Sequence, residues 1–251
     1  MIILVCNILS YIKKNIPMLS YVAPSFSNKT LNNQYINYKV DTLMCQKAQN
    51  YLGLQEVNYR EYNNLDSSKK KLTQASLLGS DWQYYMKSGA SWCALSMDTL
   101  LKKCGYNIID PSIDKVEPNG HGKGVYATVD EFVAWGKKKG TYRAINTSLK
   151  TPTEVQIKKQ MSMMHEADFI IWKGKNNLGK SMSHIGMIES VDKINGTITV
   201  LEGNANEYNR TNTRVTKVNA RDGFIRKVYT INELINSGYS GYIDNSKLIK
   251  R

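Results

Sequence analysis

The first part of the chain has hydrophobic residues at helical spacing. Residues 40–52 place apolar side chains on one face and are followed by Gly53, which predicts a helix that ends there. Residues 89–104 have a second apolar face, and Gly89 and Ser91 are placed to form the turn and the N-cap that precede a helix. This second face is formed by Leu95, Met97, Leu100, Leu101 and Cys104. The spacing therefore predicts two helices in this part of the chain.

Two N-capping signatures predict further helices. Thr128 and Glu131 are spaced as a capping box, which predicts a helix that ends near Gly140. Residues 151–154 repeat the signature with a proline at the first helical position, and this helix is expected to continue to about Met164.

The second half of the chain is rich in β-prone residues. Asn195-Gly196 separates two such runs, which is a strong signal for a β-hairpin. The predicted strands are 168–172, 183–191, 197–204, 213–218 and 223–229. Helices followed by an antiparallel sheet of about five strands predict the α+β class.

Cys93 falls in the first turn of the helix predicted for residues 89–104. Backbone N–H groups there have no intrahelical partner, and the positive end of the helix dipole favours an anion. A thiol in this position loses its proton more readily, and the thiolate is the nucleophile. Cys93 is therefore a candidate nucleophile, although most free cysteines are small buried hydrophobic residues.

A cysteine nucleophile needs a base, and the base needs a group that orients it. His184 lies in the first arm of the predicted hairpin, and the second arm ends in Glu202 and Asn204. Pairing of the arms would bring His184 and Glu202 to the same end of the hairpin. Glu202 or Asn204 could then hold one imidazole nitrogen and leave the other free for Cys93, as in a Cys-His-acid arrangement.

Three short motifs, in this order along the chain, resemble the CHAP-domain amidases and peptidases, papain-like cysteine hydrolases related to the NlpC/P60 enzymes. They are Trp92-Cys93-Ala94, Ser183-His184-Ile185-Gly186-Met187 and Leu201-Glu202-Gly203-Asn204, and the resemblance covers roughly residues 41–229. The resemblance implies a papain-like domain in which N-terminal helices pack on the sheet. It implies Cys93 as nucleophile, His184 as base, Glu202 as orienting residue and Asn204 as an auxiliary polar group.

The resemblance also implies a substrate. These enzymes cut amide bonds of bacterial peptidoglycan, either the muramoyl–L-alanine bond or a bond of the stem peptide or cross-bridge, and no cofactor or metal is expected. Two positions depart from the family: Ala167-Asp168 stands where members often have Gly-Asp, and Trp92 where many have Gln. Tyr84, Tyr85 and Trp92 are candidate substrate-binding aromatics that could equally belong to the core, and either tyrosine could donate a hydrogen bond to the oxyanion.

The chain is basic, with 34 Lys and Arg against 21 Asp and Glu and a formal net charge of +13. Such a surface favours a polyanionic partner, either a bacterial wall with anionic polymers or nucleic acid. The lysines are scattered, and the sequence has no zinc finger, RNA-recognition signature or compact basic–aromatic stripe, so no specific nucleic-acid partner is predicted. A monomer that binds the wall is expected, without a membrane span.

Two other functions stay open at this point. One is a wall-binding module on the same fold that has lost catalysis, although Cys93, His184 and Glu202 are all present. The other is a basic nucleic-acid-binding protein, which would bind DNA or RNA in a strongly salt-dependent way and without need of a thiol.

The cysteines at 6, 45, 93 and 104 have no metal-site spacing, and those other than Cys93 are expected to be buried thiols. Residues 1–9 are apolar, but no Lys or Arg precedes them, so no signal peptide is predicted. A wall-directed enzyme would then act at the bacterial wall or outside the cell by another route, such as phage delivery. We expect a lead-in at 1–39, a catalytic domain at 40–230 and a C-terminal extension at 231–251, with a short helix in the extension.

Overall fold

The computed structural model describes residues 43–79, 82–83, 91–113, 125–145, 151–175, 181–205 and 222–248. The chain divides into two compact units, residues 1–36 and 37–251, and all described residues belong to the second. The lead-in 1–39, the strand predicted at 213–218, Cys6, Tyr84 and Tyr85 lie outside the described residues.

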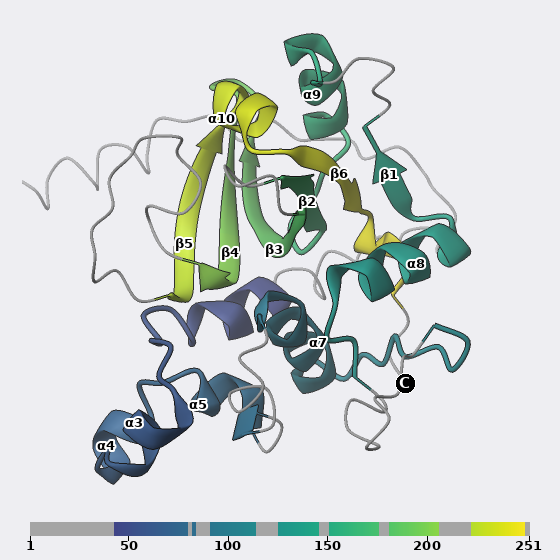
Figure 1. The fold of residues 1–251 in the computed structure, drawn as a ribbon. Coiled ribbons are helices and arrows are strands. Elements are labelled where there is room, and N and C mark those ends of the chain that lie inside the picture. The colour runs from purple at the N-terminus through teal and green to yellow at the C-terminus, as the bar shows by residue number, and fades with distance from the viewer. Residues whose placement is uncertain are drawn as a thin grey trace, which may run out of the picture. The chain divides into compact units, whose positions relative to one another are not determined.

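The described part of the chain has an α+β architecture, in which N-terminal helices pack on an antiparallel sheet (Figure 1). The expected helix before Gly53 is present over residues 43–49, and short helices follow it: α3 (Tyr59–Asn63), α4 (Ser67–Lys70) and α5 (Ala75–Leu78). Then come α7 (Cys93–Lys103) and α8 (Val129–Lys139). Residues of 43–49, α7 and α8 share one hydrophobic core with the facing side of the sheet.

The sheet has six strands in the order β1-β6-β2-β3-β4-β5, and every neighbouring pair is antiparallel. The strands are β1 (Tyr142–Ala144), β2 (Phe169–Lys175), β3 (Ser181–Asp192), β4 (Thr197–Ala205), β5 (Gly223–Thr230) and β6 (Tyr239–Ile243). The prediction of a central strand at 168–172 and of a β3–β4 hairpin closed by Asn195-Gly196 is confirmed, and Gly196 has φ +65°.

Two strands, β1 and β6, were not expected. The C-terminal stretch contains the predicted short helix, α10 (Ile231–Asn236), but it also supplies β6, which lies inside the sheet between β1 and β2. Glycine is depleted in strands, so Gly238 just before β6 and Gly241 within it concealed this strand. Gly241 is nevertheless required there, because a Cβ atom at this position would lie 2.3 Å from the carbonyl oxygen of Arg143 on β1.

The first predicted capping box is confirmed and the second is displaced. Thr128 accepts the N–H of Glu131, whose carboxylate accepts the N–H of Thr128, and α8 ends at Gly140 with φ +67°. The second helix, α9 (Glu154–Met161), uses Thr153 and Gln156 as its capping box, so the assignment of the cap to Thr151 and of the end to Met164 was wrong. Threonine followed three residues later by glutamine offers the same reciprocal hydrogen bonds, which explains the shift.

The opposite face of the sheet is covered by α9 and α10. Side chains of these two helices form a second hydrophobic core with Ile170, Trp172 and Tyr229 of the sheet. In Figure 1, α9 and α10 lie at one end of the strands, whereas α7 lies at the other end, where it contacts β3 and β4. No helix in the described ranges is long and apolar enough to cross a membrane. The start of α7 thus meets the beginning of β3 and the end of β4.

Candidate active site

Cys93 is the first residue of α7, as the helical pattern predicted. The residue before the helix is Trp92, so the prediction of Ser91 as N-cap was wrong; Trp92 makes no side-chain capping bond. The Trp92 side chain is instead fully buried in the core, and this hydrophobic contact fixes the entry to the helix. The backbone N–H of Ala94, in the first turn of α7, is close enough to the Cys93 sulfur to donate a hydrogen bond to it.

The thiol of Cys93 is buried, and burial raises its pKa. The charge of His184, its hydrogen bond with the thiol, and hydrogen bonds from the backbone N–H groups of Ile185 and Ala94 lower the pKa by more, so the thiol ionises below its ordinary range. The structure therefore brings Cys93 and His184 together, although 91 positions of sequence separate them.

His184 lies between Cys93 and Glu202. Its Nε2 atom is 2.9 Å from Oε2 of Glu202, whose side chain is 0% exposed. Because Nε2 faces the carboxylate, Nδ1 is the ring nitrogen available to the thiol. The ring of Trp172, directly opposite His184 on β2, lies 5.7 Å away between centroids and restricts the imidazole from another side. The side chains predicted to be the nucleophile, the base and the orienting carboxylate thus lie together.

Two glycines create the room that this arrangement needs. A Cβ atom at position 186 would lie 3.0 Å from Cγ of Glu202 and 2.6 Å from Val200, so Gly186 leaves the space across which Glu202 reaches His184. A Cβ atom at position 203 would lie 2.4 Å from Oγ of Ser96 and 2.8 Å from the Trp92 ring, so Gly203 lets α7 approach β4. Both glycines belong to the motifs quoted above, but sequence reasoning gave neither a role in the site.

The polar environment of Trp92 also includes a carboxyl group that sequence reasoning missed. Burial raises the pKa of Glu56, the hydrogen bond from the Trp92 side chain lowers it, and the charge of Asp222 raises it, so that the net shift is upward. Trp92 is 0% exposed, which favours the core alternative over the substrate-binding one that the sequence had left open. Trp92 directly precedes α7, so the packing of its ring in the core helps to fix the start of that helix.

Asn204 lies at a β-bulge, where the register between β4 and β5 shifts between Gly203 and Ala205. Its φ is +57°, a left-handed conformation that asparagine adopts more easily than most residues. This backbone requirement accounts for an asparagine directly after Glu202 and Gly203, while its role as an auxiliary polar group stays a prediction.

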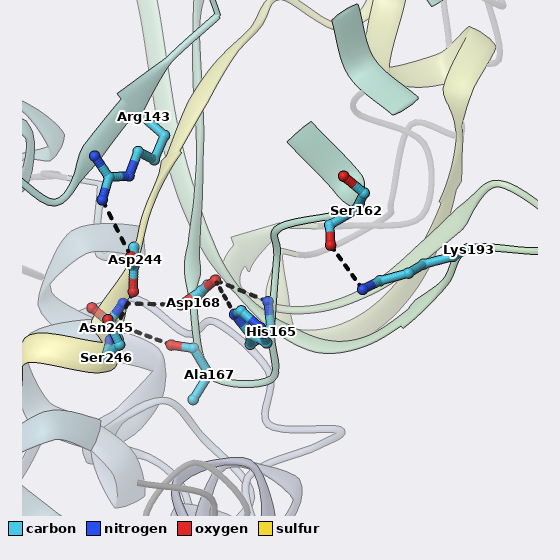
Figure 2. Close-up of polar contacts among 9 residues, drawn as sticks. All are labelled: Arg143, Ser162, His165, Ala167, Asp168, Lys193, Asp244, Asn245 and Ser246. Atoms are coloured by element: carbon cyan, nitrogen blue, oxygen red, sulfur yellow. Dashed lines mark hydrogen bonds and ion pairs between the residues drawn. The ribbon is translucent and has the colours of Figure 1, made fainter. Parts of the chain in front are cut away.

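Ala167 and Asp168 stand where the family that the motifs resemble often has Gly-Asp, and the backbone at Ala167 is one that favours glycine. Ala167 has φ +64°, the region in which glycine is favoured, so the glycine that family members often carry fits this conformation without strain. The carboxylate of Asp168 accepts the backbone N–H groups of His165 and Asn245, each at 2.9 Å, and the Asn245 side chain donates to the Ala167 carbonyl (Figure 2). The hydrogen bonds of Ala167 and Asp168 therefore connect the start of β2 to the segment after β6.

Replacement of Ala167 with glycine is expected to raise the free energy of unfolding by about 0.5–1 kcal/mol, because relief of left-handed strain outweighs the added freedom of the unfolded chain. Denaturant unfolding measures the change. The control is Ala127→Gly, a half-buried loop position outside the left-handed region, which should lose about 0.5–1 kcal/mol. An equal loss at both positions would contradict the strain at Ala167.

The remaining cysteines of the described ranges, Cys45 and Cys104, are buried thiols, as predicted. In the same ranges, no three His, Cys, Asp or Glu side chains are grouped so that they could hold a metal ion. Comparisons of the chain with protein-family models, with curated proteins and with solved structures find no match. Functional inference therefore starts from the geometry of Cys93, His184 and Glu202.

Proposed function

We propose that this protein is a cysteine hydrolase of the papain-like, CHAP-domain type that cleaves an amide bond of peptidoglycan. One observation carries the proposal: His184 shares hydrogen bonds both with the Cys93 thiol and with the Glu202 carboxylate. This is the arrangement in which a base activates a nucleophile while a third group orients the base.

The proposed reaction is acyl transfer through a thioester. The Cys93 thiolate attacks the amide carbonyl carbon, and the backbone N–H of Cys93 at the start of α7 can donate to the oxygen that becomes negative. The C–N bond breaks as the His184 imidazolium gives its proton to the leaving amine. Water, deprotonated by His184, then attacks the thioester and releases a carboxylic acid and the free thiol.

The choice of peptidoglycan rests on the motif resemblance and on charge. The three motifs of the resemblance all lie at the site: the start of α7, the start of β3 and the end of β4. The formal charge of +13 favours an anionic wall as the surface on which the protein works. The cleaved amide is either the muramoyl–L-alanine bond or a bond of the stem peptide or cross-bridge, at the wall or delivered there by a phage.

Digestion of purified peptidoglycan followed by mass spectrometry tests the proposal. The wild-type protein is expected to release fragments with new amine ends, whose masses identify the bond, and Cys93→Ala is expected to release none. Absence of cleavage by the wild-type protein would overturn the proposed substrate. Wall clearance by Cys93→Ala at the wild-type rate would instead favour a binding module, and tight salt-dependent binding to DNA without wall cleavage would favour the nucleic-acid alternative.

A further inference from the structure

The reactive form of the proposed site has an unbalanced charge. A thiolate at Cys93 and a carboxylate at Glu202 are both negative, whereas His184 supplies one positive charge when it is protonated. All three side chains are largely buried: Glu202 is 0% exposed, Cys93 4% and His184 8%. Burial of an uncompensated charge is costly, so a second cation near Glu202 would stabilise the reactive form.

The sheet register places Lys227 beside Glu202. On the β4–β5 ladder Val200 is opposite Lys227, and Glu202 is opposite Ile225. Residues directly opposite share a face, as do residues two apart, so Lys227 and Glu202 lie on one face as diagonal neighbours, a separation that long side chains can bridge.

The Lys227 side chain turns toward this covered face of the sheet and away from solvent. Its ammonium nitrogen is buried and lies 5.1 Å from the centre of the Tyr229 ring. The Tyr229 ring lies 5.3 Å from that of Trp172, which lies 5.7 Å from the imidazole of His184. Lys227 thus belongs to the side-chain layer that surrounds the base and its orienting carboxylate.

The neighbouring cation on the same strand is differently engaged. Arg226 points to the other face, is partly exposed, and makes a bidentate ion pair with Glu189. Cys93 on α7, His184 on β3, and Lys227 and Tyr229 on β5 are titratable groups on the elements around Glu202. The same elements also carry Asp98, Lys102 and Lys103 (α7), Glu189 and Asp192 (β3) and Arg226 (β5). Glu56 accepts a hydrogen bond from Trp92, and its pKa responds to the charge of Asp222. Unlike Arg226, Lys227 lies on the same face of the β4–β5 ladder as Glu202 and has a buried ammonium.

We propose that Lys227 is a positioning residue of this site: its buried ammonium keeps Glu202 ionised. The Glu202 carboxylate then orients the His184 imidazole and stabilises its protonated form. The inference rests on the proposed catalytic roles of Cys93, His184 and Glu202. Without the lysine, a buried Glu202 takes up a proton more readily, a neutral Glu202 supports the imidazolium less, and the Cys93 thiolate forms at higher pH.

The test is the pH dependence of Cys93 alkylation by iodoacetamide, followed by mass spectrometry of the peptide that contains Cys93. In Lys227→Met the acidic limb of this profile should move up by about one pH unit, which slows alkylation about tenfold on the acid side. Lys227→Arg, which keeps the charge, should restore most of the wild-type profile. Arg226→Met, on the same strand but the other face, should leave the profile unchanged.

A second measurement separates the proposed path from a general loss of structure. In a Glu202→Gln background, Lys227→Met should cause no further shift, because the lysine acts through the carboxylate. Circular dichroism checks folding, and Lys227→Gln replaces the methionine variant if that variant does not fold. An unmoved limb in Lys227→Met, or a shift that persists with Glu202→Gln, would overturn the proposal.

The alkylation assay needs no wall substrate, so its outcome is separable from that of the peptidoglycan digestion. A shifted limb in a protein that cleaves no peptidoglycan would retain the role of Lys227 and reject the proposed substrate. Cleavage of peptidoglycan by a protein whose alkylation profile is unmoved in Lys227→Met would support the proposed substrate and reject the role of Lys227.

Discussion

Replacement of His184 with alanine is expected to slow alkylation of Cys93 by about 100-fold at about pH 6, equivalent to two units of thiol pKa. In the wild-type protein, burial raises the pKa of the Cys93 thiol, and the charge and hydrogen bond of His184, together with two backbone N–H groups, bring it below its ordinary value. Without the imidazole the effect of burial dominates. The thiolate then forms only above the ordinary thiol pKa of about 8.5, so the rate rises at alkaline pH alone.

The measurement is the alkylation rate of the Cys93 peptide across the pH range, with circular dichroism as a check of folding. The matched control is His165→Ala, because the His165 side chain is 68% exposed and lies in the loop before Asp168. That variant should keep the wild-type profile. A His184→Ala protein that reacts as fast as wild type on the acid side would disprove the thiol–imidazole pair, and the hydrolase proposal with it.

Replacement of Gly203 with alanine is expected to lower the free energy of unfolding by about 1–3 kcal/mol, the usual cost of overpacking. The added methyl group would lie 2.4 Å from Oγ of Ser96 and 2.8 Å from the Trp92 ring, so α7 must move away from β4. Cys93 would move with α7, whereas His184 would stay on β3. The proposed peptidoglycan cleavage should therefore fall by about 100-fold even where the variant is folded, since an ångström of misplacement can cost that much.

Denaturant unfolding and the cleavage assay, run below the unfolding midpoint of the variant, separate the two effects. Gly174→Ala on β2 is the control, because a Cβ atom there meets its nearest neighbour, Cα of Gly238, at an ordinary 3.7 Å. That variant should be close to wild type in cleavage. Wild-type stability and cleavage in Gly203→Ala would show that the approach of α7 to β4 is not needed for the site.

The parts of the fold that were predicted correctly are those with strong local signals. The helical spacing of α7, the capping box of α8 and the Asn195-Gly196 turn each determine their element from a few neighbouring residues. The hairpin also predicted the approach of His184 to Glu202, because pairing of adjacent strands fixes which residues meet. The place of Cys93 beside them followed only from the motif resemblance, since no local signal links α7 to β3.

Other features depended on contacts that the sequence does not display. On β5, Val228 is 52% exposed and the ammonium of Lys227 is buried, the reverse of what residue hydrophobicity alone favours. The two spacer glycines, Gly186 and Gly203, are explained only by the side chains that approach them from other elements. The left-handed φ of Ala167 goes against the preference of alanine, so the residue gave no sign of it.

The position of β6 has a consequence for biosynthesis. β6 comes after β1 to β5 in chain order but lies between β1 and β2, so β1 has no neighbour in the sheet until residues 239–243 have left the ribosome. During translation β2 therefore presents an open row of N–H and C=O groups, the kind of edge through which nascent chains aggregate. A chaperone that shields this edge would raise the yield of folded protein, and a nonsense mutation just before Tyr239 would leave the edge open permanently.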